Sequence, residues 1–193
     1  MKKQLLALAM TSAISAGAMA QANVFEGFSA GVSVSSVGST TEVSGNGSSV
    51  NMGQQSMVPT IEAGYTFGIN KDFAVGLTAT YDLSDTKSGS ADDLNFKGTN
   101  HYSVNLKPGY VTGNTMLYAI LGYHGMKGTA NYLGESSSLN FNGFGAGAGI
   151  AVLLTKNVFV KAEAQQITYS SKTDGATFKP SATVGTIGVG YKF

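Results

Sequence analysis

The stretch that decides the fold is TVGTIGVGYKF, which runs from Thr183 to Phe193 at the end of the sequence. Successive side chains of an extended strand point to opposite faces, and this stretch alternates accordingly. One face is apolar and aromatic toward its end, with Ile187, Val189, Tyr191 and Phe193, whereas the other is small or charged. An apolar strand is a sticky edge unless it is paired. We therefore expect it to close a β-barrel against the first strand, with its apolar face in lipid.

The N-terminus predicts export. Lys2 and Lys3 precede the apolar run from Leu5 to Ile14, and small residues follow up to Ala20. A basic start, a short apolar run and an A-x-A pattern are typical of a secretory signal peptide. The run is shorter than the ~20 residues of a membrane-spanning helix. We expect residues 1–20 to be a signal peptide cleaved after Ala20, and residues 21–193 to form one β-barrel domain.

Composition disfavours several classes of protein. The expected mature chain keeps 12 − 2 = 10 lysines against 11 acidic residues, a net charge of 10 − 11 = −1, and it has no arginine. Such a chain has no basic stripe for a nucleic-acid partner. It has no cysteine, which excludes disulfides, thiol nucleophiles and cysteine metal sites. After the N-terminus no apolar run is long enough for a membrane helix.

The mature chain contains eight alternating segments, joined by connections that are long and short in turn. The expected strands are 26–37, 58–67, 73–82, 101–110, 116–124, 139–153, 158–169 and 183–193. Turn residues predict short connections after the second, fourth and sixth strands, and polar stretches predict long ones elsewhere. In the seventh segment Ile167 and Tyr169 fall out of phase, so we expect a β-bulge near Gln166.

Alternation alone does not say which face is outside, since a lipocalin-like soluble barrel would point its apolar face inward. The polar face is mostly Gly, Ser and Thr with few charges, which suits a narrow lumen better than a water-facing surface. Aromatic residues gather at two rims: Phe67, Phe73, Tyr110, Tyr191 and Phe193, and Tyr81, Tyr102, Tyr123 and Tyr169. These features predict a closed antiparallel eight-stranded up-and-down transmembrane β-barrel, an all-β fold with short periplasmic turns and long extracellular loops.

Three motifs carry a family resemblance: FNGFGAGAGIAV (141–152), VFVKAEAQ (158–165) and the ending GVGYKF (188–193). With them the mature chain resembles the eight-stranded outer-membrane β-barrel superfamily of the OmpA membrane domain, OmpX and opacity-type proteins. The resemblance implies a Gram-negative outer membrane, contact with its lipid and lipopolysaccharide, and an assembly signal read by the barrel-assembly machinery. That signal is Ile187, Val189, Tyr191 and Phe193. We expect a monomer without a cofactor.

The lumen face carries four charges: Glu62, Lys107, Lys161 and Glu163. Small barrels fill their interior with side chains, and buried charges need partners. We therefore expect a lumen charge network that plugs the barrel, with glycines 143, 145, 147 and 149 leaving room for Tyr118 and Phe159. The alternative is a narrow porin-like channel whose polar constriction is formed by the same residues.

Catalytic and metal sites are not predicted. His101 and His124 are expected near the outer rim, and His124 has no serine beside it. His101 and Ser103 share the lumen face, which points away from a lipid substrate. The acids Asp82, Asp85, Asp92 and Asp93 do not follow the spacing of a calcium loop. No residue supplies the remaining roles of a lipid A deacylase or an outer-membrane protease.

We therefore expect a non-enzymatic outer-membrane protein that acts in membrane integrity or in surface interaction through its extracellular loops. A narrow channel is the second hypothesis and a lipid-modifying enzyme the third. Binding hot spots are usually aromatic or arginine, and the loops offer few large anchors, namely Tyr132, Leu133 and Phe178. The sequence predicts no specific surface ligand.

Overall fold

The computed structural model describes residues 23–45, 48–91, 94–132, 135–173, 176–178 and 181–193. Its strands are β1 (Gly27–Gly45), β2 (Ser48–Gly68), β3 (Phe73–Asp82), β4 (Thr86–Ala91), β5 (Leu94–Thr112), β6 (Thr115–Tyr132), β7 (Glu135–Leu153), β8 (Val158–Thr173), β9 (Ala176–Phe178) and β10 (Ser181–Lys192). No helix in this described part of the chain is long and apolar enough to cross a membrane. The expected signal peptide lies outside the described residues.

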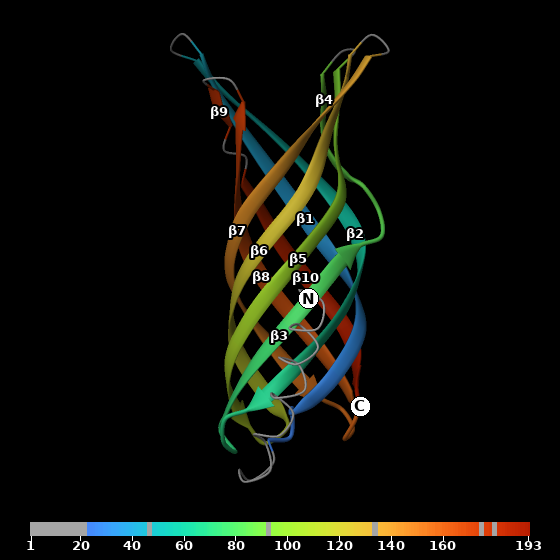
Figure 1. The fold of residues 1–193 in the computed structure, drawn as a ribbon, viewed down its shortest axis with the longest axis vertical. Coiled ribbons are helices and arrows are strands. Elements are labelled where there is room, and N and C mark those ends of the chain that lie inside the picture. Colours follow the sequence, from blue (N-terminus) through green and yellow to red (C-terminus); the bar gives the residue numbers. More distant parts are fainter. Residues whose placement is uncertain (1–22, 46–47, 92–93, 133–134, 174–175, 179–180) are drawn as a thin grey trace, which may run out of the picture.

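Eight of the strands close into an antiparallel barrel, as the alternation predicted (Figure 1). The order around the barrel is β10-β1-β2-β3-β5-β6-β7-β8, and β10 also pairs with β8. The pairs of β10 run along Ser181–Lys192 with β1 and along Ser181–Tyr191 with β8. The short strands β4 and β9 pair only with β5 and β8. The C-terminal strand thus has a neighbour on each edge, which confirms the prediction that it closes the barrel.

At one end the strands run further than the expected ranges. β1 and β2 stay paired up to Gly45 and Ser48, so the polar stretch 38–56, expected as a loop, is mostly a two-stranded ribbon. β6 and β7 likewise stay paired up to Tyr132 and Glu135. Backbone hydrogen bonds build these ladders, so a loss of apolar side chains does not end them. We call this end the ribbon end, and the opposite end, with connections 69–72, 113–114 and 154–157, the short-turn end (Figure 1).

Large apolar side chains cover the outside of the barrel. Val32, Ile61, Leu77, Val104, Leu106, Leu121, Ile187 and Val189 are 43–69% exposed. Exposed aromatic rings lie beyond this band, with Phe28, Phe73, Tyr110, Tyr191 and Phe193 near the short-turn end and Tyr81, Tyr102, Tyr123 and Phe144 toward the ribbon end. Water-soluble monomers do not expose so large an apolar surface. This band is therefore the lipid-facing surface.

The β-bulge expected near Gln166 is wrong. β8 keeps an unbroken register with β7 from Ser170 to Phe159 and with β10 from Thr168 to Val158. Odd-numbered residues of β8 face the lumen throughout, so Tyr169 is 5% exposed and belongs to no aromatic rim. Phe144, which is 75% exposed, occupies the outer face there instead. Inward and outward positions keep alternating along β8. The apolar residues move from the outer face to the inner face, because the solvent outside the barrel changes from lipid to water.

Toward the ribbon end the barrel is apolar inside and polar outside. Its inner cluster consists of Ile167, Tyr169 and Ala182, packed against Val37, Met126, Phe141 and Val184. On the outer face the Thr183 hydroxyl donates to Gln166 Oε1 at 2.6 Å, and Gln55 Nε2 donates to Ser36 Oγ at 2.7 Å. This is the polarity of a water-soluble β-structure. β8 therefore passes from lipid into water near Gln166 without changing its register with β7 or β10, whereas the register of β5 with β6 shifts between Thr99 and Tyr102.

The segment before β1 packs into the short-turn end. Asn23 Nδ2 donates to the carbonyl oxygen of Asn70 at 2.8 Å, and the carbonyls of Lys71 and Phe73 lie at 3.4 Å. Phe25 is 7% exposed and joins an apolar cluster inside the barrel. The other members of this cluster are Ala74, Val111, Met116, Tyr118, Ile120, Ala151 and Leu153, with Phe159 packed against them. Apolar side chains thus fill the lumen at this end.

Candidate functional site

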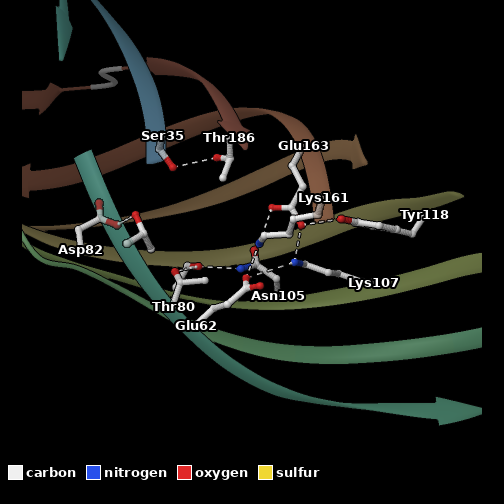
Figure 2. Close-up of polar contacts among 12 residues, drawn as sticks. Ser35, Glu62, Thr80, Asp82, Asn105, Lys107, Tyr118, Lys161, Glu163 and Thr186 are labelled. Carbon is white, nitrogen blue, oxygen red and sulfur yellow. Dashed lines mark hydrogen bonds and ion pairs between the residues drawn. The ribbon is translucent and has the colours of Figure 1, made fainter. Parts of the chain in front are cut away.

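The lumen charge network lies midway along the described barrel. Glu62 on β2, Lys107 on β5, and Lys161 and Glu163 on β8 all point inward, because each occupies the lumen phase of its strand (Figure 2). Lys107 Nζ donates to Glu163 Oε1 at 2.6 Å. Lys161 Nζ donates to Glu62 Oε2, and it lies 3.4 Å from Glu163 Oε2. The four side chains thus meet across the barrel from three strands.

Burial makes this pairing obligatory. The four side chains are only 4–9% exposed, and the remaining ion pair, between Lys107 and Glu62, spans 4.0 Å. An unpaired charge in such surroundings costs several kcal/mol, whereas a complete set of hydrogen-bonded pairs offsets its own desolvation. Two ammonium and two carboxylate groups make the network electrically neutral as a unit.

Tyr118 closes the network on the short-turn side. Its hydroxyl donates to Glu163 Oε1 at 2.8 Å, and Lys107 Nζ lies 5.5 Å from its ring centroid. A β-carbon at Gly149 would lie 2.7 Å from the Tyr118 ring, so the ring needs the space that this glycine leaves. Phe159 differs from the expectation, because its ring packs against Gly190 of β10 instead of the glycines of β7.

On the ribbon side of the network lies a small polar chamber of about 90 Å³. Hydroxyl pairs line its wall: Ser35 with Thr186 at 2.8 Å and Thr80 with Ser103 at 2.7 Å (Figure 2). Glu62, Lys161 and Glu163 form its floor, and Ile167, Tyr169 and Val184 of the inner apolar cluster border it toward the ribbon end. The chamber is large enough to hold ordered water, and polar side chains line it.

An Asp–His–His chain also borders this chamber. His101 Nδ1 lies 2.8 Å from Asp82 Oδ2, and His101 Nε2 lies 3.2 Å from His124 Nδ1. The two imidazole rings stack with centroids 5.4 Å apart, and His124 is 2% exposed. The sequence interpretation put both histidines near the outer rim and missed this chain. The signal was available, because Asp82, His101 and His124 share the lumen phase of neighbouring strands.

In the described part of the lumen, the Asp–His–His chain has no serine hydroxyl bonded to a histidine, as a nucleophilic catalytic site would need. The Ser103 hydroxyl bonds with Thr80 at 2.7 Å and accepts from Asn105 Nδ2 at 2.7 Å, and neither partner is a histidine. Among the described residues no group of three or more His, Cys, Asp or Glu side chains is placed to hold a metal ion. Asp92 and Asp93 lie outside the described residues. Asp82, His101 and His124 are thus arranged to hold protons and to position one another.

Three of the expected assembly-signal residues lie on the outer face of β10, and Phe193 follows directly after the strand. Ile187, Val189, Tyr191 and Phe193 are 69, 45, 47 and 73% exposed. The Tyr191 and Phe193 rings meet edge to face, with centroids 5.2 Å apart. They form an exposed apolar edge near the short-turn end.

Comparisons with known proteins agree with this architecture. A comparison with curated protein sequences finds no match. Among solved structures, Ail, the attachment invasion locus protein of Yersinia pestis, is 20% identical, with 87% of this chain and 99% of that chain covered and a TM-score of 0.58. Neisserial surface protein A (NspA) is 18% identical, with 86% and 97% covered and a TM-score of 0.57.

The same fold also occurs in an enzyme. The outer-membrane protease OmpT of Escherichia coli is 8% identical, with 91% of this chain and 99% of that chain covered and a TM-score of 0.50. Similarity at these identities establishes a fold and no activity. The family model for the outer membrane protein beta-barrel domain matches residues 6–193. The chain therefore belongs to the outer-membrane β-barrel family and is a protein of the outer membrane.

Proposed function

We propose that the protein is a non-enzymatic outer-membrane barrel whose lumen is sealed and whose role is carried by its ribbon end. The observation that carries this proposal is the buried network of Glu62, Lys107, Lys161 and Glu163. Both lysines are held by both glutamates, and the apolar cluster around Phe25 fills the lumen beneath them. An ion would have to displace these charge pairs and then pass apolar side chains, which offer it no ligands.

A planar-bilayer recording tests the seal. Protein isolated from outer membranes should give no steady single channels, because both the charge network and the apolar cluster block the lumen. Insertion is confirmed separately by protease protection. The narrow channel is the second candidate, because the chamber and the network form a continuous polar stretch of lumen. Steady channels whose ion selectivity changes in Glu62→Gln or Lys161→Met would establish that channel and overturn the seal.

We infer a surface role from the ribbons. They prolong the barrel wall beyond the lipid band, and in this family that end faces outward (Figure 1). Ail and NspA are named as an attachment invasion protein and a surface protein, and they share this fold. Neither name identifies a ligand for this chain. The alternative within the same proposal is a contribution to membrane integrity.

A shortened ribbon separates these two roles. Deleting residues 41–52 and joining Thr40 to Gly53 by a two-residue turn keeps the β1–β2 pairs below that point. Cells carrying this variant should adhere to an epithelial monolayer no better than cells without the protein, and their dye uptake should match that of the wild type. Equal adhesion by all three strains, with dye uptake raised only where the protein is missing, would assign the protein to membrane integrity.

Export and assembly belong to the same proposal. We propose cleavage after Ala20, monomeric insertion beside lipopolysaccharide, and recognition of the β10 outer face by the barrel-assembly machinery. The exposure of Ile187, Val189, Tyr191 and Phe193 supports a role in recognition. N-terminal sequencing of the assembled protein tests the cleavage site. Crosslinking from position 191 during insertion tests the contact with the machinery.

A further inference from the structure

The chamber contains a carboxylate without a fixed cation. Glu62 and Glu163 are paired with Lys107 and Lys161, whereas Asp82 accepts, among the described residues, only from the Thr60 hydroxyl at 2.7 Å and from His101 Nδ1. The Asp82 side chain is 9% exposed. Around the chamber and the charge network, three carboxylates therefore stand against two lysines. A buried carboxylate needs a positive partner, and the nearest group that can carry a charge is His101.

The hydrogen bonds restrict where protons can sit. A neutral imidazole has one N–H and one bare nitrogen, and an imidazolium has two N–H groups. Because the Asp82 carboxylate can only accept, His101 Nδ1 carries a hydrogen. The bond between His101 Nε2 and His124 Nδ1 has room for one hydrogen. If both rings are neutral, that hydrogen belongs to His124, and His124 Nε2 is left bare.

Two buried polar atoms report on this choice. Three side-chain atoms of the described residues are buried without a hydrogen-bond partner, and two of them, His124 Nε2 and Asn105 Oδ1, belong to residues that line the chamber. Both atoms lie against Gly122, where a β-carbon would come 2.6 Å from His124 Nε2 and would also collide with Asn105 Oδ1. With both rings neutral, two acceptors without a donor lie beside Gly122. A hydrogen on His124 Nε2 would instead face the amide oxygen.

We propose that the His101–His124 pair is a binding site for one proton, held between Asp82 and Asn105 in the outer half of the lumen. The proton makes His101 an imidazolium whose Nδ1–H donates to Asp82 and whose Nε2–H donates to His124 Nδ1. His124 stays neutral and carries its hydrogen on Nε2, toward Asn105. One proton thus balances the third carboxylate and puts a hydrogen on His124 Nε2, on the side of Gly122 where Asn105 Oδ1 also lies.

The site holds one proton and no more. A second proton would place N–H groups on both His101 Nε2 and His124 Nδ1, which face each other at 3.2 Å, and their bond would break. Among the described residues that line the chamber, no further acid faces the pair to compensate it. Beside Asp82 of β3, the titratable and charged groups around the chamber are Tyr169, Lys161 and Glu163 of β8 and Glu62 of β2. β7 presents only Gly143 and Gly145 to this region, and the glutamates are already paired.

One rearrangement of the same residues would need no proton. With its amide turned over, Asn105 would donate to a bare His124 Nε2 and accept from Ser103. The two arrangements differ in the number of bare imidazole nitrogens. The sequence has two histidines and hence 2 × 2 = 4 ring nitrogens. One is bare in the one-proton state, two are bare when both rings are neutral, and none is bare when both are charged.

Nitrogen-15 NMR of the histidine rings tests the proposal directly. The untagged, histidine-labelled protein is isolated from outer membranes, placed in lipid nanodiscs and recorded near neutral pH. We expect one bare nitrogen, assigned to His124 Nδ1, and three protonated ones. Two bare nitrogens would overturn the proposal in favour of the neutral chain with the turned amide. No bare nitrogen would overturn the limit of one proton.

A matched pair of variants tests the role of Asp82. Asp82→Asn keeps an acceptor for His101 but removes the charge, so the spectrum should change from one bare nitrogen to two. Asp85→Asn alters an exposed acid and should leave the spectrum unchanged. Retention of the proton in Asp82→Asn would contradict the proposed charge balance. A folded variant migrates more slowly on a gel after boiling than before it, so this comparison confirms that each variant is folded. If Asp82→Asn does not fold, the wild-type spectrum still decides the proposal.

Discussion

Replacing Lys161 by glutamate should lower the free energy of unfolding of the barrel by about 3–5 kcal/mol, the usual cost of leaving buried charges unpaired. Lys161 Nζ contacts both Glu62 and Glu163, and its side chain is 4% exposed. The variant would put a third carboxylate beside these two and leave only Lys107 to pair with them. Urea unfolding in lipid vesicles, followed by the loss of heat-modifiable migration, measures the change.

Two further variants test whether loss of the ion pairs causes the loss of stability expected for Lys161→Glu. Lys161→Met combined with Glu62→Gln removes the charges together, leaves Glu163 paired with Lys107, and should recover most of the lost stability. Lys71→Glu reverses a side chain that is 69% exposed at the short-turn end, and it should change stability by no more than about 0.5 kcal/mol. Equal losses in Lys161→Glu and in the double variant would mean that packing of the lysine stem, and not its charge, stabilises the barrel.

Replacing Gly147 by valine should destabilise the barrel by at least about 3 kcal/mol or prevent its assembly, because overpacking against backbone forces the strands apart. Gly147 pairs with Gln165 of β8. A β-carbon at Gly147 would collide with the Ala164 carbonyl oxygen and lie 2.8 Å from Gln165 Cα. Backbone atoms cannot rotate away, so the β7–β8 ladder must open. The same urea experiment measures the loss.

Gly185→Val is the matched control, since a β-carbon at Gly185 has nothing within 4 Å. This residue lies on the outer face of β10 and is exposed. The substitution should leave stability within about 0.5 kcal/mol of the wild type. If both valine variants assemble and unfold alike, close approach of β7 and β8 is not the reason for glycine at position 147.

Period-2 alternation was sufficient to predict the strands and their two faces, whereas the few charges on the polar face and the aromatic rims were needed to predict that the apolar face is outside. Alternation then put Glu62, Lys107, Lys161 and Glu163 on the lumen side, and a strand that alternates without interruption cannot turn one of them outward. Which lysine meets which glutamate depends on the stagger between strands, and alternation within one strand contains no information about stagger. The pairing of Lys107 with Glu163 across the barrel therefore had to come from the structure.

The mistaken bulge has a clear physical origin. Apolar side chains face outward only while the solvent outside is lipid, and near Gln166 that solvent becomes water. Apolar side chains avoid water on both sides of this point. Ile167 and Tyr169 therefore point into the lumen, whereas Val160, nearer the short-turn end of β8, points outward into lipid. Several expected strands ended too early for another reason: polar stretches were expected to be loops, whereas backbone hydrogen bonds continue the ladders through them. The contact between His101 and His124 was missed because it again depends on stagger, which sets the height of both rings in the lumen.

The unbroken register of β8 and β10 has a consequence for how such a protein can vary. Because inner and outer faces alternate through the whole strand, an insertion or deletion of two residues per strand leaves every remaining side chain on its own side. A change of one residue exchanges the faces beyond it and would turn side chains such as Ile167 toward water. We expect related proteins to differ in ribbon length by steps of two residues per strand. The surface at the ribbon end would then vary, while each residue of the barrel wall keeps its inward or outward position.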